Sequence, residues 1–201
     1  MESTHDRWLV LTVSSLFSVN VGLLILWLAG AAPGLSAEDG VLETLQVLLA
    51  VSAASVFVFV AFEGKGPVAS SATALAAIAI IATMREIDVR RIVVPDWMMI
   101  WANSPFRDTT VAVLLLLVLV YLWFRREDFG GWSSMLLSPS AWPLWLSGIL
   151  LTSSLTLDGG KVISGELGVV VEEFVELNGF MLLLIAAWRH CRLLTQRSEH
   201  A

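Results

Sequence analysis

Long apolar runs separated by short polar or turn-forming segments dominate the pattern along this chain. Six of these runs approach the roughly 20 apolar residues that a helix rising ~1.5 Å per residue needs to cross a bilayer core of ~30 Å. The pattern predicts an all-α fold, a polytopic membrane helical bundle with about six transmembrane helices. We expect them in one integral membrane domain, 1–201, at residues 8–32, 41–62, 67–84, 109–124, 141–157 and 164–188.

Turn and capping residues mark the edges of these runs. Pro67 suits the first position of the third helix, and Asp108 is the predicted N-cap of the fourth. Residues 92–101, rich in Trp and Met, are too few to span and predict an interfacial or re-entrant segment. The apolar run at 8–32 exceeds the ~7 to 15 residues of a signal-peptide core, so we expect a span that is retained.

Composition supports the bilayer as the solvent of this chain. Hydrophobic residues make up 57%, charged residues only 15%, and the mean hydropathy is +0.79. The net charge of -6 excludes the broad basic surface that nucleic-acid binding requires, so nucleic acid is not an expected partner. Cys191 is the single cysteine and cannot form an internal disulfide. The expected partners are the lipid bilayer and either another membrane protein or further copies of this chain.

The distribution of lysine and arginine predicts the orientation. Seven of the 12 basic residues lie on the side that carries both termini, which are Arg7, Lys65, Arg125, Arg126, Arg189, Arg192 and Arg197. Positively charged loops favour the cytoplasmic side. We therefore expect both termini in the cytoplasm and an integral location in a bacterial inner membrane.

The sixth run carries three acidic residues at membrane depth, Glu172, Glu173 and Glu176. Ionisable groups are costly there and are rarely kept without a role. Helical spacing places Glu172 and Glu176 on one stripe with small residues, with Glu173 at the edge of the stripe and Asn178 on another face. Similar stripes of small residues occur in the second and third runs, around Ala50 and Ala53 and at Ala72, Ala76 and Ala79. These faces are predicted to pack closely.

The topology also brings polar groups from three runs to the outer side. The candidate ligand- or ion-binding residues are Glu43, Gln46, Arg85, Glu86, Asp88, Glu172, Glu173 and Glu176. Six acids face three arginines, Arg85, Arg90 and Arg91, so negative charge remains unless the site takes up protons or a cation. Carboxylate oxygens suit calcium or magnesium, with Glu172 and Glu176 as the predicted metal ligands. Salt bridges between these acids and the arginines are the structural alternative.

Three functions remain open on these grounds. The first is an outward-facing acidic cavity that binds a proton, a cation or a small cationic solute, coupled to transport. The second is a non-catalytic membrane subunit or assembly factor, and the third is a lipid-directed membrane enzyme. The common motifs of hydrolases, metalloproteases and phosphate-binding loops are absent, which disfavours an enzyme. We interpret His190 as a solvated or interfacial histidine and Asn20 as part of an interhelical hydrogen-bonding set.

Three short acidic patterns carry a resemblance to a family. They are Glu38-Asp39 with Glu43, Arg85-Glu86-Ile87-Asp88, and Glu172-Glu173 with Glu176. In these the chain resembles small, uncharacterised bacterial multi-pass inner-membrane proteins. The resemblance extends over most of the chain, and it implies the location in the inner membrane but no activity.

Overall fold

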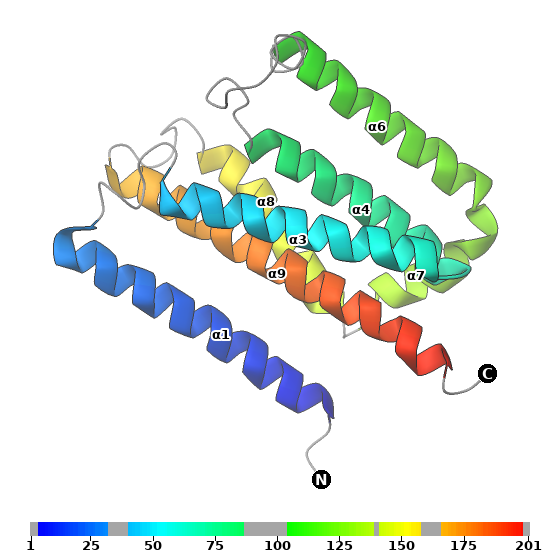
Figure 1. Ribbon diagram of the computed structural model, residues 1–201, viewed down its shortest axis with the longest axis horizontal. Helices are drawn as coiled ribbons and strands as arrows, with labels where there is room; N and C mark the ends of the chain where they lie inside the picture. Colours follow the sequence, from blue (N-terminus) through cyan, green and yellow to red (C-terminus); the bar gives the residue numbers. More distant parts are fainter. Residues whose placement is uncertain (1–3, 32–39, 87–103, 139–140, 158–165, 199–201) are drawn as a thin grey trace. The chain divides into compact units, whose positions relative to one another are not determined.

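A computed structural model describes residues 4–31, 40–86, 104–138, 141–157 and 166–198. Every regular element in these ranges is a helix, as predicted (Figure 1). The long helices are α1 (Thr4–Leu26), α3 (Val41–Glu63), α4 (Pro67–Glu86), α6 (Ser104–Phe124), α8 (Trp142–Leu157) and α9 (Glu166–Ser198). Each of the six predicted runs is therefore helical where the structure describes it. The predicted interfacial segment 92–101 lies outside the described residues.

Within the part of the chain that the structure describes, three helices are long and apolar enough to cross a membrane. They cover Val10–Gly30, Val41–Glu63 and Pro67–Met84, which match the first three predicted spans closely. A shorter apolar helix covers Asp108–Phe124. These helices indicate an integral membrane protein, in agreement with the composition.

Three helix ends differ from the prediction. Because α6 begins at Ser104, Asp108 lies within the helix and is not its N-cap. Pro105 is tolerated in that first turn because its missing N–H has no partner there in any helix. Helix α1 continues into a short π-helical turn, η1 (Trp27–Ala31), where Gly30 has a φ of 83°. At the other end of the chain, α9 runs ten residues past the predicted end at 188.

A short helix that was not predicted, α7 (Phe129–Leu136), follows the 3-10 turn η3 (Arg126–Asp128). The glycine pair Gly130-Gly131 masks it, because glycine lowers helix propensity. Gly131 approaches Pro67 of α4 closely, since a Cβ at Gly131 would lie 2.8 Å from the Cβ of Pro67. This close approach explains why a glycine occupies the position. Helix α7 contacts α4 through this approach.

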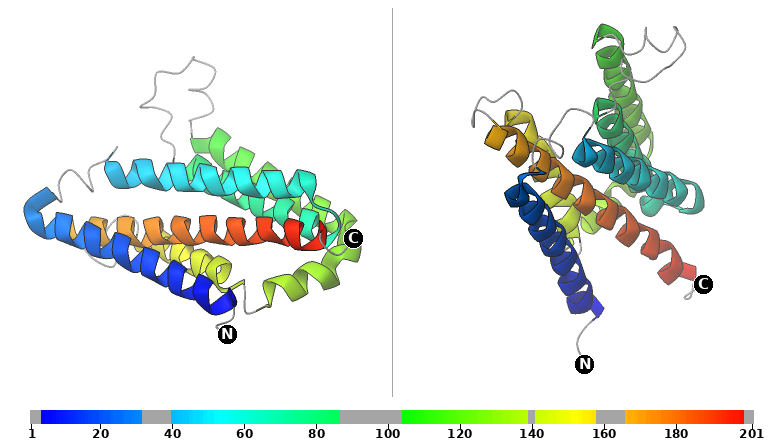
Figure 2. Two further views of the ribbon diagram at one scale, coloured as in Figure 1. Left: turned by 60° about the horizontal axis from the view of Figure 1, so that its bottom comes forward. Right: turned by 60° about the vertical axis from the view of Figure 1, so that its left-hand side comes forward.

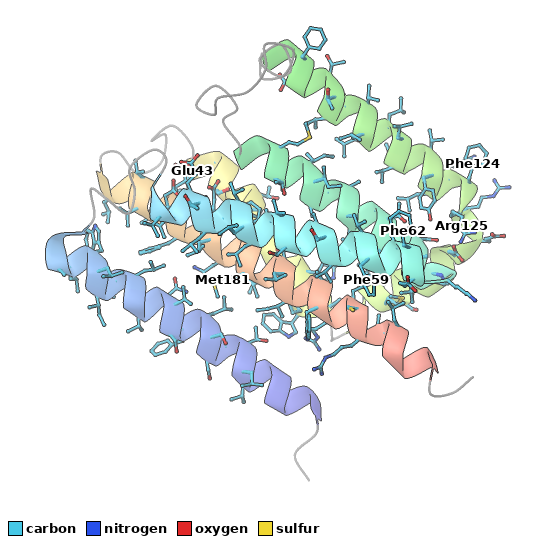
Figure 3. All side chains as sticks on the ribbon, viewed as in Figure 1. Glu43, Phe59, Phe62, Phe124, Arg125 and Met181 are labelled. Atoms are coloured by element: carbon cyan, nitrogen blue, oxygen red, sulfur yellow. The ribbon has the colours of Figure 1, made fainter. Side chains whose placement is uncertain are left out.

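The chain divides into two compact units, each described by itself. The first comprises Met1–Leu49 and Ser138–Ala186, and the second comprises Ala50–Leu137 and Ala187–Ala201. In the first unit Leu23 of α1, Leu42 of α3 and Leu177 of α9 form a buried cluster, and Met181 packs against it (Figure 3). In the second unit Val60, Val68 and Ala72 form another cluster.

The α3–α4 turn follows directly from its residue types. The Gly64 N–H donates to the Val60 carbonyl at 2.8 Å, which closes α3, and Gly66 has a φ of 57° that favours glycine. Pro67 then begins α4, as predicted. The turn therefore lets α3 and α4 lie as neighbours within the second unit (Figure 2).

The predicted small-residue stripes are buried. Ala50 and Ala53 of α3 are fully buried, and so are Ala72 and Ala79 of α4. Gly168 and Gly179 of α9 are also buried. Small side chains let helix backbones approach closely, so the burial of these stripes confirms their assignment to helix packing.

Gly179 offers a test of this packing in the first unit. The Ser147 hydroxyl of α8 donates to the Gly179 carbonyl at 2.8 Å, and a Cβ at Gly179 would lie 2.8 Å from Leu151 Cγ. We expect Gly179→Ala to destabilise the protein by about 1 to 3 kcal/mol, because Leu151 must move out of a packed position. Unfolding in mixed micelles by titration with sodium dodecyl sulfate measures this change.

Gly148→Ala is the matched control on α8, where the added Cβ meets nothing within 4 Å. We expect it to be neutral or to stabilise the helix by up to about 1 kcal/mol. Equal effects of the two substitutions would contradict a close α8–α9 approach at Gly179.

Candidate functional site

The polar contact between α3 and α9 in the first unit centres on Gln46 and Glu173. Gln46 is 1% exposed, and its Nε2 donates to Glu173 Oε2 at 2.7 Å and to the Glu173 carbonyl at 3.1 Å. A backbone carbonyl can only accept, so this second bond fixes the amide with its N–H groups toward Glu173. Gln46 therefore presents two donors to a single residue of α9 and orients its carboxylate.

Further acids surround this pair. The charges of Glu43 of α3 and of Glu172 and Glu176 of α9 all act on Glu173. Glu176 is 5% exposed, and the other three glutamates are half-buried. Figure 3 labels Glu43 on the first part of α3. We call Gln46, Glu43, Glu172, Glu173 and Glu176 the acidic cluster.

Within α9, Glu173 has a more central place in the acidic cluster than the sequence predicted. The helical stripe placed Glu172 and Glu176 at the centre and Glu173 at the edge, whereas Glu173 makes the direct hydrogen bond to Gln46. The stripe was drawn from the spacing of small residues along α9, and that spacing does not show where a residue of α3 reaches the helix. The five residues of the acidic cluster nevertheless all belong to the eight predicted site residues, so the structure brings five of the eight together.

The remaining three predicted site residues have no described side chain. Arg85 and Glu86 lie in the last turn of α4, and Asp88 lies outside the described residues. Arg90 and Arg91 also lie outside them, so the salt-bridge alternative stays a prediction. Among the side chains that the structure describes, no three His, Cys, Asp or Glu residues form a metal-binding group. The metal role of Glu172 and Glu176 therefore also stays a prediction.

A second polar contact joins α1 to α9 on another face. The side chains of Asn20 and Asn178 exchange two hydrogen bonds, at 2.7 Å and 2.9 Å, and each also donates to the carbonyl four residues earlier in its own helix. This confirms the interhelical role predicted for Asn20. It also explains why Asn178 faces away from the acidic stripe. Polar side chains that pair across apolar helices fix their rotation and register.

The second unit holds polar contacts that were not predicted from the sequence. The Ser70 hydroxyl of α4 donates to Asp128 Oδ2, and Asp128 also pairs with Arg125 Nε at 3.3 Å. The neighbouring Ser71 bonds to His190 of α9. The His190 ring therefore packs within the protein, so the expectation that it is solvated is wrong, whereas its place at the membrane interface stays a prediction.

Comparison with known proteins adds no family or function. No family model matches the chain, no curated protein matches it, and no solved structure matches it. The acidic cluster is therefore the feature of this protein that bears on its function.

Proposed function

We propose that this chain is a six-span protein of a bacterial inner membrane that reversibly binds a proton or a cation at the acidic cluster and couples that binding to transport. Both termini would lie in the cytoplasm, and the acidic cluster would face outward. The observation that carries the proposal is the Gln46–Glu173 hydrogen bond, made by a fully buried amide beside three further carboxylates.

The electrostatics of the cluster support reversible binding. The charges of Glu43, Glu172 and Glu176 repel an ionised Glu173, and burial adds a desolvation cost for the charge of Glu173. Uptake of a proton or a cation relieves both costs. Gln46 only donates hydrogen bonds to Glu173, so it stabilises the ionised carboxylate. A bound proton or cation can then leave this carboxylate, which makes the binding reversible.

The depth of the cluster supports an outward site. Twelve residues separate Glu176 from the predicted inner end of the span at Trp188, which is an axial rise of ~18 Å. In a core of ~30 Å the cluster would then lie roughly 10 Å below the outer boundary. A proton or small cation would reach it through the protein and not through lipid.

Calorimetry on the detergent-purified protein tests the proposal. Sodium, potassium, magnesium and calcium would each be titrated between pH ~5 and 8, in two buffers of different ionisation enthalpy, so that the protons released per cation bound are measured. We expect saturable binding with proton release, because cations compete with protons for carboxylates. Binding without proton release would contradict a shared site.

A potentiometric titration separates the remaining outcomes. If no cation binds, the proposal predicts that the protein still takes up at least one proton in this pH range that a variant without the acidic cluster does not. Absence of both signals would overturn the proposal and favour a non-catalytic subunit, whose partner association would survive neutralisation of the cluster.

A further inference from the structure

His190 occupies a contact between α9 and the beginning of α4, two residues past the predicted end of the sixth span. Its Nε2 lies 2.9 Å from Ser71 Oγ and 3.3 Å from the Val68 carbonyl oxygen. The ring also meets Phe57 of α3 edge-on, with ring centroids 6.0 Å apart. All of these residues belong to the second unit, so one imidazole joins three helices within it.

The hydrogen bonds assign the proton on the ring. The Val68 carbonyl can only accept, and the Ser71 hydroxyl donates to the Pro67 carbonyl at 2.8 Å, which leaves its oxygen free to accept. Nε2 therefore carries the proton and donates to both oxygens. Nδ1 is then the position that takes up a proton when the ring becomes charged.

Apart from the two oxygens at Nε2, the partly buried ring packs against the apolar side chain of Phe57. Phe57 is fully buried, Ser71 is 3% exposed, and Cys191 packs against the neighbouring cluster of Val60, Val68 and Ala72. Burial lowers the pKa of His190 below its ordinary value of 6.5, and the bond to the Val68 carbonyl opposes this shift more weakly. At neutral pH the ring is therefore uncharged.

The charged groups around this contact do not offset the burial. Arg189 and Arg192 adjoin His190 on α9, and both are positive. Lys65 lies exposed in the turn before α4. Asp128 of η3 accepts a hydrogen bond from Ser70, the neighbour of Ser71. The charge of Asp128 is already paired with Arg125. Helix α3 contributes the uncharged ring of Phe57.

We propose that His190 is a pH-sensitive latch, which holds the C-terminal part of α9 against the first turn of α4 at neutral pH and releases it when the medium on that side is acidified. The latch does not depend on the acidic cluster. The sign follows from proton linkage. Below pH 6.5 the released, hydrated histidine binds more protons than the histidine in the contact. The free energy that favours the closed contact therefore decreases as the pH decreases from 6.5 to the lowered pKa of His190.

Cys191 provides the readout, because it is the single cysteine of the chain and packs beside the latch. The rate of thiol labelling by a maleimide would be measured in lipid nanodiscs from pH 7.5 to 5.5 for the wild type and for His190→Gln, which keeps a donor but does not titrate. The ratio of the two rates at each pH cancels the change in thiolate fraction. We expect this ratio, normalised to pH 7.5, to rise up to about tenfold at pH 5.5, one unit below 6.5. A ratio that stays constant would overturn the latch.

Ser71→Ala removes one acceptor of the His190 bond and leaves the titrating ring. We expect faster labelling than in the wild type at pH 7.5, with the acceleration by acid retained. An unchanged rate at pH 7.5 would show that this hydrogen bond does not hold the contact, and would overturn the proposal.

A titration of the ring itself tests the latch even if His190→Gln fails to fold. The chain has three histidines, so a His5→Gln/His200→Gln variant retains His190 alone. Its imidazole signal in nuclear magnetic resonance is expected to titrate with a midpoint below pH 6.5. A midpoint at or above 6.5 would overturn the proposal.

Discussion

Glu173→Gln is expected to weaken proton or cation binding by about a hundredfold or more. Removing a buried charge from a binding site typically costs ~2 to 5 kcal/mol. Glu173 is the acid that Gln46 orients, at 2.7 Å, and the acid on which Glu43, Glu172 and Glu176 all act. The glutamine variant keeps the shape of the side chain, and calorimetry in two buffers would measure the loss of both binding and proton release.

Two substitutions make this prediction specific to Glu173. Glu63→Gln removes an exposed carboxylate from the far end of α3 and is expected to leave binding unchanged. Glu172→Gln neutralises the neighbouring position on α9 and is expected to weaken binding less than tenfold, because three carboxylates and the Gln46 contact remain. Equal losses in Glu172→Gln and Glu173→Gln would contradict the central place of Glu173.

Phe57→Ala is expected to destabilise the protein by about 3 kcal/mol. Phe57 is fully buried on α3 and is among the largest side chains so enclosed. Lipid tails are as apolar as a protein core, so the loss comes mainly from the cavity and from missing contacts and not from transfer into water. Titration with sodium dodecyl sulfate in mixed micelles would measure the free energy of unfolding.

Phe59→Ala is the matched control, two residues further along the same helix (Figure 3). Phe59 is 53% exposed, so its removal leaves no enclosed cavity. We expect a change within about 0.5 kcal/mol. A similar loss for both substitutions would show that the α3 face carrying Phe57 is not the packed one.

The sequence predicted helices best where apolar length and turn chemistry agreed. The α3–α4 pair is the clearest case, since Gly64, Gly66 and Pro67 fix the turn through local backbone requirements. The stripes of Ala50 with Ala53 and of Ala72 with Ala79 were likewise recognised from helical spacing, and they are buried. Helix α7 was missed because its glycines argue against a helix, while its contact with Pro67 of α4 depends on residues distant in sequence.

The amino-acid sequence by itself determined the class of this protein, its helical runs and the presence of acids within an apolar helix. These are local properties, set by hydropathy and by a period of 3.6 residues. Only the tertiary structure decided which partners those residues take: Gln46 with Glu173, Asn20 with Asn178, and Ser71 with His190. The residues of each pair lie more than 100 positions apart in the chain, so the packing of the helices determines which side chains meet.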